Sequence, residues 1–223
     1  MMHCTNMRTN GWLVLLLLPM LAACVTGGEV KPEVTAAPPS PAGAATTALE
    51  DGRHGFIITE TPAMDEAARR DFEQAVSLMN AQAYGEAREL LATVVARAPG
   101  VTAPHINLAI ACRHLDRPEE AEEQLKAALR LVPEHPAACT EYGLLCRKAG
   151  RFAEAREMYE KVLARYPDYY PARRNLGILC DIYLNDAECA IEQYALYSAA
   201  RPEDPQVKIW LADLRNRVGA AGR

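Results

Sequence analysis

The chain has 223 residues, of which 50% are apolar and 24% are charged, and its formal net charge is −5. This length and apolar content allow one sizeable hydrophobic core or a row of smaller ones. Aromatic residues make up only 6% of the chain and alanine is frequent, which favours helices packed through small side chains over a β-sandwich. The acidic balance, without a basic arm, gives no electrostatic basis for binding nucleic acid.

The first segment predicts export from the cytoplasm. After a start at Met1 or Met7, Arg8 precedes the run GWLVLLLLPMLAAC, which ends at Cys24. A membrane-spanning helix needs about 20 apolar residues, and this run is shorter, as in a secretory signal. The last four residues of the run, LAAC, resemble the bacterial lipobox, in which the cysteine becomes the lipidated first residue of the mature protein. An ordinary signal peptide with a chance cysteine, or an uncleaved anchor, is the alternative interpretation.

The lipobox resemblance implies a signal peptide over residues 1–23 and lipidation of Cys24. Val25 follows the cysteine where an aspartate would, by resemblance to enterobacterial lipoproteins, indicate retention in the inner membrane. We therefore expect attachment to the outer membrane, facing the periplasm. One acyl chain binds a membrane only reversibly, so stable anchoring requires the several chains that the resemblance implies.

Residues 24–67 are predicted to form a disordered tether between the lipid and the folded part. The stretch is rich in proline, alanine, threonine and glycine, a composition that cannot offset the entropy cost of ordering. A short apolar, β-prone run at residues 55–59 interrupts it. We expect Phe56, Ile57 and Ile58 either to cover the first helices or to form a strand that adds to the sheet edge of a partner.

The remainder of the chain carries an internal repeat. Prolines recur at equivalent places and divide the sequence into four units, 68–101, 102–135, 136–169 and 170–204, closed by Pro99, Pro133, Pro167 and Pro202. The first three units have 34 residues and the fourth has one more. Because proline cannot continue a helix, each one marks the end of a helix pair.

Within the units, three positions keep one class of side chain. Position 8 is small, as Ala75, Ala109, Gly143 and Gly177, position 20 is Ala87, Ala121, Ala155 and Ala190, and position 24 is Leu91, Leu125, Tyr159 and Tyr194. Small residues at two of these positions allow two antiparallel helices to approach closely. The pattern resembles the tetratricopeptide repeat, a helix-turn-helix unit, although Asp71, His105, Cys139 and Arg173 stand where that family often has tryptophan.

The resemblance implies an all-α solenoid of four helix-turn-helix repeats over residues 68–204. The segment 205–218 has apolar residues at helical spacing, namely Val207, Trp210, Leu211 and Leu214, with charged residues elsewhere. It is predicted to form the helix that caps the solenoid, followed by a tail at residues 219–223.

In this family the first helix of each pair lines a concave groove, and the resemblance implies a protein-binding site there. The groove residues predicted are Phe72, Val76, Ile106, Asn107, Ile110, Arg113, His114, Leu144, Arg147, Lys148, Arg174, Asn175 and Ile178. They place an apolar track beside a cationic stripe, suited to an acidic and apolar peptide segment whose backbone the two asparagines would bond. The alternative is that Arg113, Arg147 and Lys148 are only the solvated ends of helices, where positive charge complements the helix dipole.

Four of the five cysteines after Cys24, all except Cys139, occupy places that the repeat explains. Cys112, Cys146 and Cys180 stand 34 residues apart at position 11, where burial in the core is expected. Cys180 and Cys189 also flank the turn of the longer fourth repeat, so they form either a disulfide or two free thiols. No metal site is expected, because equivalent positions of stacked repeats lie about a helix diameter apart and no CxxC or HxxxH pair occurs.

The sequence predicts a binding protein and not an enzyme, since it contains no phosphate-binding loop, nucleophile elbow or metal-spaced histidine pair. We expect no cofactor and no small-molecule substrate, but a protein partner in the cell envelope and a membrane contact through the N-terminal lipid. The chain resembles the repeat-containing pilotins of pilus secretins and a component of the β-barrel assembly machinery, which implies an assembly factor. The alternative function is a structural or peptidoglycan-associated scaffold that recruits cell-wall hydrolases.

Overall fold

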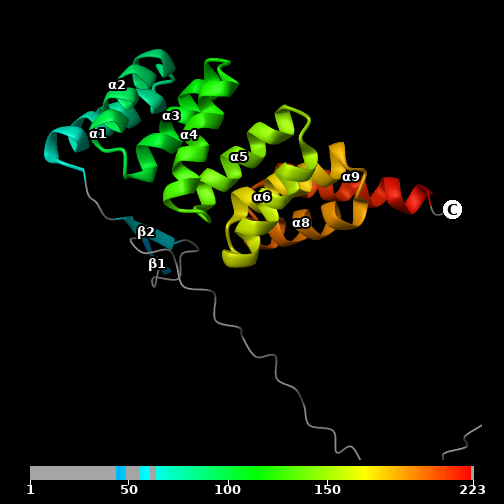
Figure 1. The fold of residues 1–223 in the computed structure, drawn as a ribbon. Helices are drawn as coiled ribbons and strands as arrows, with labels where there is room; N and C mark the ends of the chain where they lie inside the picture. The colour runs from blue at the N-terminus through cyan, green and yellow to red at the C-terminus, as the bar shows by residue number, and fades with distance from the viewer. Residues whose placement is uncertain (1–43, 49–55, 61–63, 222–223) are drawn as a thin grey trace, which may run out of the picture. The chain divides into compact units, whose positions relative to one another are not determined.

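The computed structural model describes residues 44–48, 56–60 and 64–221. The predicted signal peptide, Cys24 and most of the predicted tether lie outside these residues. From Glu66 onward the chain forms a succession of helices (Figure 1). Their bounds are α1 Glu66–Asn80, α2 Tyr84–Arg97, α3 Thr102–His114, α4 Pro118–Leu131, α5 Pro136–Lys148, α6 Phe152–Arg165, α7 Tyr170–Ile178, the π-helical turn η1 Leu179–Tyr183, α8 Ala187–Ala200 and α9 Pro205–Ala221.

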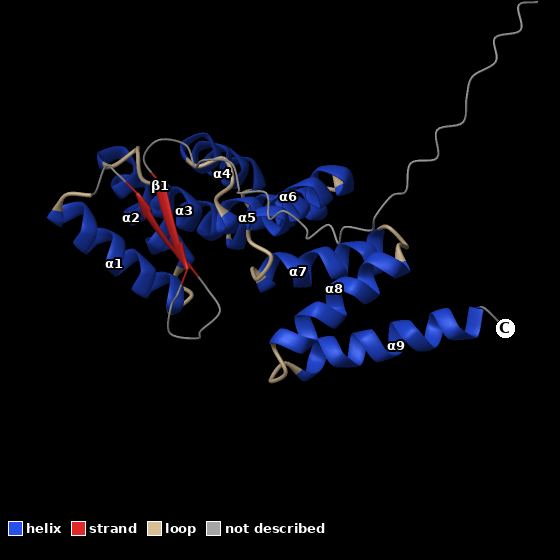
Figure 2. Cartoon of the chain, turned by 90° about the horizontal axis from the view of Figure 1, so that it is seen from below, coloured by secondary structure: helices blue, strands red, loops and turns tan. Residues whose placement is uncertain are grey.

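The helices pack as four pairs followed by a final helix, which confirms the predicted all-α solenoid. Within the repeats α1 contacts α2, α3 contacts α4, α5 contacts α6 and α7 contacts α8, and the second helix of each repeat contacts the first helix of the next. The first helices α1, α3, α5 and α7 also contact one another in sequence, so they form a shared face. Figure 2 shows α7, α8 and α9 in succession at the C-terminal end.

The small residues at positions 8 and 20 lie where the paired helices approach, as predicted. All six alanines at these positions are buried with at most 1% exposure, namely Ala75, Ala109, Ala87, Ala121, Ala155 and Ala190. A Cβ atom added to Gly143 would lie 2.6 Å from a ring carbon of Tyr159, and one added to Gly177 would lie 2.5 Å from a ring carbon of Tyr194. The first two repeats have alanine at position 8 and leucine at position 24. A larger side chain at position 8 therefore accompanies a smaller one at position 24.

A residue in the left-handed conformation ends the first helix of every repeat. These residues are Gln82, Asp116, Gly150 and Asn185, with φ values of 60°, 58°, 77° and 51°. A left-handed residue at this place is a common way to end a helix, because it redirects the chain and lets backbone N–H groups reach the last carbonyls. The four turns therefore provide an independent register for the repeats.

This register shows where the fourth repeat accommodates its additional residue. Cys112 and Cys146 precede the left-handed residue of their turn by four positions, whereas Cys180 precedes Asn185 by five. The π-helical turn η1, Leu179–Tyr183, lies between α7 and that turn. A π-helical turn inside an α-helix widens one turn, so it absorbs the insertion before the second helix begins.

The last helix covers the end of the solenoid. Val207, Leu211 and Leu214 are buried against the preceding helices, and Trp210 packs on Tyr194 with ring centroids 5.8 Å apart. This arrangement confirms the predicted apolar side of the capping segment. The helix continues to residue 221, beyond the predicted end at 218. Among the described residues, no helix combines the length and the apolar character needed to cross a bilayer.

A two-stranded antiparallel sheet precedes the helices in the chain. Strand β1, Ala44–Ala48, pairs with strand β2, Phe56–Glu60, in a register that runs from Ala44 opposite Glu60 to Ala48 opposite Phe56. Strand β1 lies within the segment that the sequence predicts to be a disordered tether, and the structure differs there. Pairing gives the apolar run the partner strand that a single strand lacks, because both segments contain β-branched residues and the strands run antiparallel within a short stretch of chain.

Candidate functional site

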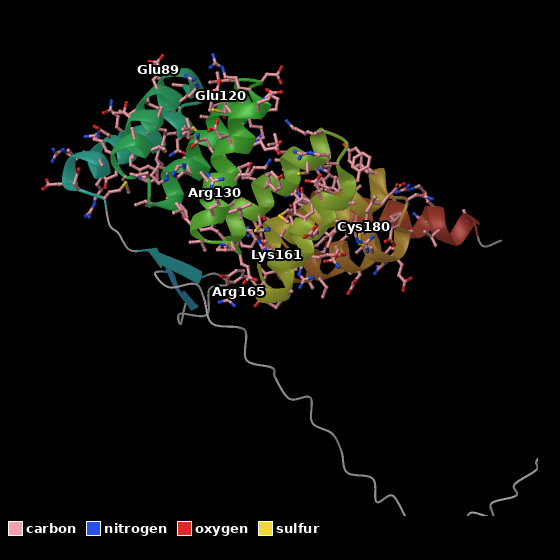
Figure 3. All side chains as sticks on the ribbon, in the orientation of Figure 1. Glu89, Glu120, Arg130, Lys161, Arg165 and Cys180 are labelled. Atoms are coloured by element: carbon pink, nitrogen blue, oxygen red, sulfur yellow. A yellow bond between two sulfur atoms is a disulfide. The ribbon has the colours of Figure 1, made fainter. Side chains whose placement is uncertain are left out.

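We use the term first-helix face for the surface formed by α1, α3, α5, α7 and η1. Most of the predicted apolar groove residues lie half-buried on these helices and remain partly accessible, namely Phe72, Val76, Ile110, Leu144 and Ile178. Each one stands at the fifth or ninth position of its repeat, so the repeat geometry brings them to one side. Figure 3 shows the side chains along the successive helices.

Ile106 is a correction to the predicted groove. Its side chain is 5% exposed and packs with Ala128 and Ala138 in a small cluster between the second and third repeats. A partner could not reach it without opening that boundary. The reason is that the fifth position of the second repeat is covered by the neighbouring repeat, a burial that the sequence period alone does not specify.

Two of the predicted arginines link consecutive repeats. Arg113 donates from Nε to Oε2 of Glu141 at 3.2 Å, and Arg147 donates from Nη2 to Oδ1 of Asn175 at 3.5 Å. In both cases position 12 of one repeat reaches position 6 of the next, so the contact repeats with the solenoid. Burial raises the pKa of the Glu141 carboxyl, and the adjacent Arg113 opposes that shift. Arg113 is therefore already paired within the chain.

The side-chain amide of each predicted asparagine donates a hydrogen bond to a backbone carbonyl of its own helix. Asn107 donates from Nδ2 to the carbonyl oxygen of Ala103 at 2.9 Å, and Asn175 donates to that of Pro171 at 2.8 Å. One N–H group of each amide is thus engaged with the preceding helical turn. Each amide has a second N–H group, so the expected role of both residues as donors to a bound peptide backbone stays a prediction.

Arg147 and Arg174 lie beside aromatic rings instead of carboxylates. The Arg147 guanidinium carbon is 5.7 Å from the centre of the Tyr183 ring, and that of Arg174 is 5.3 Å from the centre of the Trp210 ring. Neither arginine forms an ion pair with any described residue, and the Nε atom of each is buried without a hydrogen-bond partner in that part of the chain. These two half-buried cations are consequently available to a carboxylate from another molecule.

Tyr183 and Trp210 are not among the site residues that the sequence predicts. Trp210 was assigned to the apolar side of the cap, where it also packs on the core through Tyr194. Tyr183 stands one place later than a 34-residue period predicts, because the additional residue lies in η1. Counting back from Asn185 instead of forward from the repeat start would have aligned Tyr183 with His114 and Lys148.

His114 does not belong to a cationic stripe. Its ring stacks on Tyr84 with centroids 4.0 Å apart and an angle of 5° between the planes. Burial, and then the positive charges of Arg113 and Lys148, lower its pKa, which favours the neutral form of the ring. Lys148 is exposed and forms no ion pair with a described residue. The positive charge that remains accessible is that of Lys148, Arg147 and Arg174.

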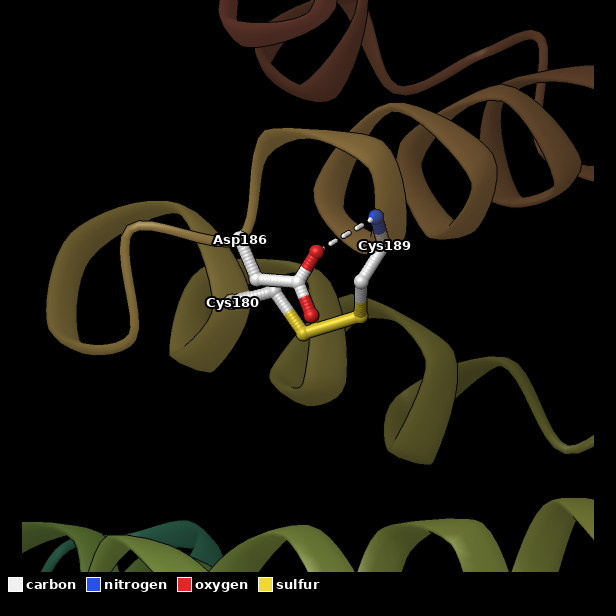
Figure 4. Close-up of side chains that lie close together, drawn as sticks. All are labelled: Cys180, Asp186 and Cys189. Carbon is white, nitrogen blue, oxygen red and sulfur yellow. Dashed lines mark hydrogen bonds between the residues drawn. A yellow bond between two sulfur atoms is a disulfide. The ribbon is translucent and has the colours of Figure 1, made fainter.

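Cys180 and Cys189 form a disulfide in the fourth repeat, with Cα atoms 6.0 Å apart (Figure 4). The bond joins η1 to the first turn of α8. Asp186 lies beside it, where Oδ1 accepts a hydrogen bond from the Cys189 N–H at 3.1 Å and Oδ2 accepts one from Arg156 at 3.0 Å. The sulfurs and this carboxylate are the three potential metal ligands grouped together in the described structure. Because the sulfurs are bonded to each other, they offer no thiolate to an ion.

The disulfide occupies two positions that also face each other in the second and third repeats. In the second repeat Cys112 Sγ lies 3.8 Å from Oε2 of Glu120, and in the third Cys146 Sγ lies 4.0 Å from Oε2 of Glu154. Each pair combines position 11 with position 19, as does the disulfide once the additional residue is counted. The three position-11 cysteines are buried, with at most 1% exposure, as the sequence predicts.

Two family models match the chain, and both describe a tetratricopeptide repeat. One covers residues 100–168 and the other covers residues 147–214. Together they extend from the second repeat into the final helix. A search of curated proteins finds no match.

Several solved structures share the helical arrangement. The chain is 20% identical to PilF from Pseudomonas aeruginosa, with a TM-score of 0.64 over 70% of this chain and 71% of that one. It is 24% identical to PilW, described as a widely conserved type IV pilus biogenesis factor, with a TM-score of 0.63 over 71% and 73% of the two chains. It is 22% identical to MamA from Desulfovibrio magneticus RS-1, with a TM-score of 0.61 over 70% and 88%.

At these identities the similarity establishes the fold. It does not transfer the binding partners of those proteins to this chain. The fold agrees with the buried alanines and glycines of the helix pairs, with the repeated turn geometry and with both family models. The helical domain of this chain is therefore a tetratricopeptide-repeat domain.

Proposed function

We propose that this chain is a lipid-anchored adaptor that binds a protein partner on its first-helix face and assists the assembly of a pilus or secretion complex in the cell envelope. The observation that carries the proposal is the pair Arg147 and Arg174, two half-buried cations without a carboxylate partner among the described residues. Hydrogen bonds to charged groups contribute about 1.5–3 kcal/mol, so a ligand carboxylate that pairs with the accessible part of these guanidinium groups gains about that amount on binding.

The neighbouring side chains define the kind of segment that fits. Ile178 and Leu144 supply partly accessible apolar surface on the same helices as the two arginines, and Tyr183 and Trp210 hold the guanidinium groups by cation–π contact. A segment with one or two acidic residues beside apolar ones satisfies both features. Arginine binds a carboxylate through two parallel hydrogen bonds, which fixes the orientation of such a segment as well as its affinity.

The proposed location rests on the sequence and on one feature of the structure. The lipobox-like residues that end at Cys24 support export and acylation, with the outer membrane as the site of attachment. The disulfide of the fourth repeat is of the kind that persists in an oxidising compartment such as the periplasm. The pilus-related structural relatives support an assembly role by analogy of fold alone.

Crosslinking from the first-helix face tests the binding site. A photoreactive amino acid at Ile178, in the full-length chain expressed in its own bacterium, is expected to capture an envelope protein that mass spectrometry identifies. Changing Arg147 and Arg174 together to glutamine should weaken binding of that purified partner at least about tenfold, the loss of about 1.4 kcal/mol. The matched control removes the same charge from the exposed Arg130 and Arg215 and should leave affinity unchanged.

Either of two results would refute the binding site: the same crosslinks from the arginine double variant, or equal loss of affinity in the control variant. The anchor has its own test. Metabolic labelling with an alkyne fatty acid should label the parent chain and leave Cys24→Ser unlabelled, with the unlabelled chain in the soluble fraction. Label on the serine variant would refute lipidation at this cysteine.

A further inference from the structure

At two of the three boundaries between repeats, a pair of aromatic rings closes the edge of the solenoid where the turns lie. Between the first and second repeats His114 stacks on Tyr84, with ring centroids 4.0 Å apart. Between the third and fourth repeats Tyr183 packs on Phe152, with centroids 5.0 Å apart. His114 and Tyr183 each stand two residues before the left-handed residue of their turn, and Tyr84 and Phe152 each begin a second helix.

The boundary between the second and third repeats lacks this ring pair. Lys148 stands two residues before the left-handed residue, in the place of the first ring, and Pro118 begins α4 in the place of the second. Ala149 follows Lys148 where the neighbouring repeats have Leu115 and Leu184. Three larger groups are thus missing from one boundary at equivalent positions.

A hollow of about 350 Å³ lies at this boundary, and Pro118, Lys148 and Ala149 form part of its wall. Leu145 completes the apolar part of the wall, and the other six lining residues are charged, namely Arg113, Asp116, Glu119, Glu122, Lys148 and Arg151. Engineered apolar cavities of about 150 Å³ hold a benzene molecule. The hollow is open to solvent and not enclosed like those cavities, and its volume is sufficient for a phenol or an indole ring.

We propose that this hollow receives a tyrosine or tryptophan side chain from the protein partner, which takes the place of the missing ring pair. The apolar wall accepts the face of the ring, as the ring pairs do at the two neighbouring boundaries. Lys148, which has no ion pair among the described residues, supplies a cation for the ring face, and Glu119 supplies an acceptor for the O–H or N–H group. An aliphatic side chain uses only the first of these features.

This inference adds a partner chemistry to the proposed function and rests on it for the existence of a partner. It can fail separately, because its test uses small ring compounds and no partner. The measurement follows backbone amide shifts of the full-length ¹⁵N-labelled chain during titration with p-cresol and with 3-methylindole. We expect saturable shifts at Leu145, Lys148 and Ala149 with a dissociation constant of about 1 mM. The non-aromatic control is 4-methylcyclohexanol, which should bind at least about tenfold more weakly.

Filling the hollow should abolish the binding. The double variant Pro118→Phe with Lys148→Tyr restores a ring pair of the kind present at the third boundary, and the Phe152 backbone shows that phenylalanine can begin a second helix. The variant Ala149→Leu introduces the residue of the neighbouring repeats and serves if the double variant does not fold. The matched control Asn80→Tyr adds a ring at the equivalent place of the first repeat, which has no preceding repeat, and should bind p-cresol as the parent does.

Three results would overturn the inference. The first is the absence of shifts at the three amides when p-cresol is tenfold above the expected dissociation constant. The second is equal affinity for 4-methylcyclohexanol, which would make the hollow a general apolar site. The third is unchanged p-cresol binding by a folded Pro118→Phe/Lys148→Tyr variant or by Ala149→Leu.

Discussion

Gly143→Ala should destabilise the third repeat although alanine is the better helix-forming residue. A Cβ atom at this position would lie 2.6 Å from Cε1 and 2.9 Å from Cζ of Tyr159. The Tyr159 side chain is 0% exposed, and neighbouring side chains surround it in the core. In a close-packed interior the ring has little space into which it can move, so the helix pair has to separate slightly.

The size of the effect follows from two opposing contributions. Overpacking a well-packed core costs about 1–3 kcal/mol. Replacing glycine by alanine inside a helix gains about 1 kcal/mol. We therefore expect the free energy of unfolding to fall by up to about 2 kcal/mol, with about 2–4 °C of melting temperature for each kcal/mol in a domain of this size.

Urea unfolding followed by far-ultraviolet circular dichroism measures this change. The control is Gly85→Ala, where an added Cβ atom has no neighbour within 4 Å, and it should lose no stability. The double variant Gly143→Ala/Tyr159→Leu reproduces the alanine and leucine pair that Ala109 and Leu125 form in the second repeat. The loss of unfolding free energy in this double variant should be about 1 kcal/mol smaller than the sum of the losses in the two single variants. A gain of about 1 kcal/mol for Gly143→Ala, which is the helix propensity without an overpacking cost, or additive single changes would show that close helix approach does not depend on this glycine.

Two further predictions concern contacts within and between repeats. Glu154→Cys should form a disulfide with Cys146 on air oxidation, because these residues occupy the positions that are bonded in the fourth repeat. Mass spectrometry under non-reducing conditions measures this bond. Two free thiols would show that the π-helical turn is needed to bring the sulfurs together. Hydrogen bonds from Arg151 hold the pKa of the Glu122 carboxyl at about 2, below its ordinary value of 4.5. The stability from this contact is present above about pH 4.5 and is lost as the pH falls towards 2, so Glu122→Gln should flatten the acid limb of a stability curve. The exposed Glu123→Gln is the control, and an equal effect of both changes would contradict the assignment.

The candidate site was only partly predictable from the sequence. The period predicts Arg147 and Arg174 on successive first helices, which are α5 and α7 in the structure, since helical position depends on spacing. It did not distinguish them from Arg113, which Glu141 pairs at 3.2 Å. An arginine side chain is long enough to reach several neighbours, so its partner depends on the distance between repeats.

The disulfide illustrates a signal that the sequence did contain. Positions 11 and 19 are Cys112 and Glu120 in the second repeat and Cys146 and Glu154 in the third. In the fourth repeat the same positions are the two bonded cysteines. Recognising that these positions face each other requires knowing that the additional residue lies in η1 and not in the turn. The period without that knowledge leaves both a disulfide and free thiols open.

The sequence by itself determined the helix pairs, the small residues between them and the place where each repeat ends. These features are local, because a glycine or alanine every 34 residues and a closing proline act within one repeat and its neighbour. Only the tertiary structure decided which cations remain unpaired, that Ile106 is covered, and that the second boundary is hollow. Those properties depend on how side chains from two or three repeats fill the same volume. The residue type at one position does not specify which neighbouring side chains contact it or how much space they leave.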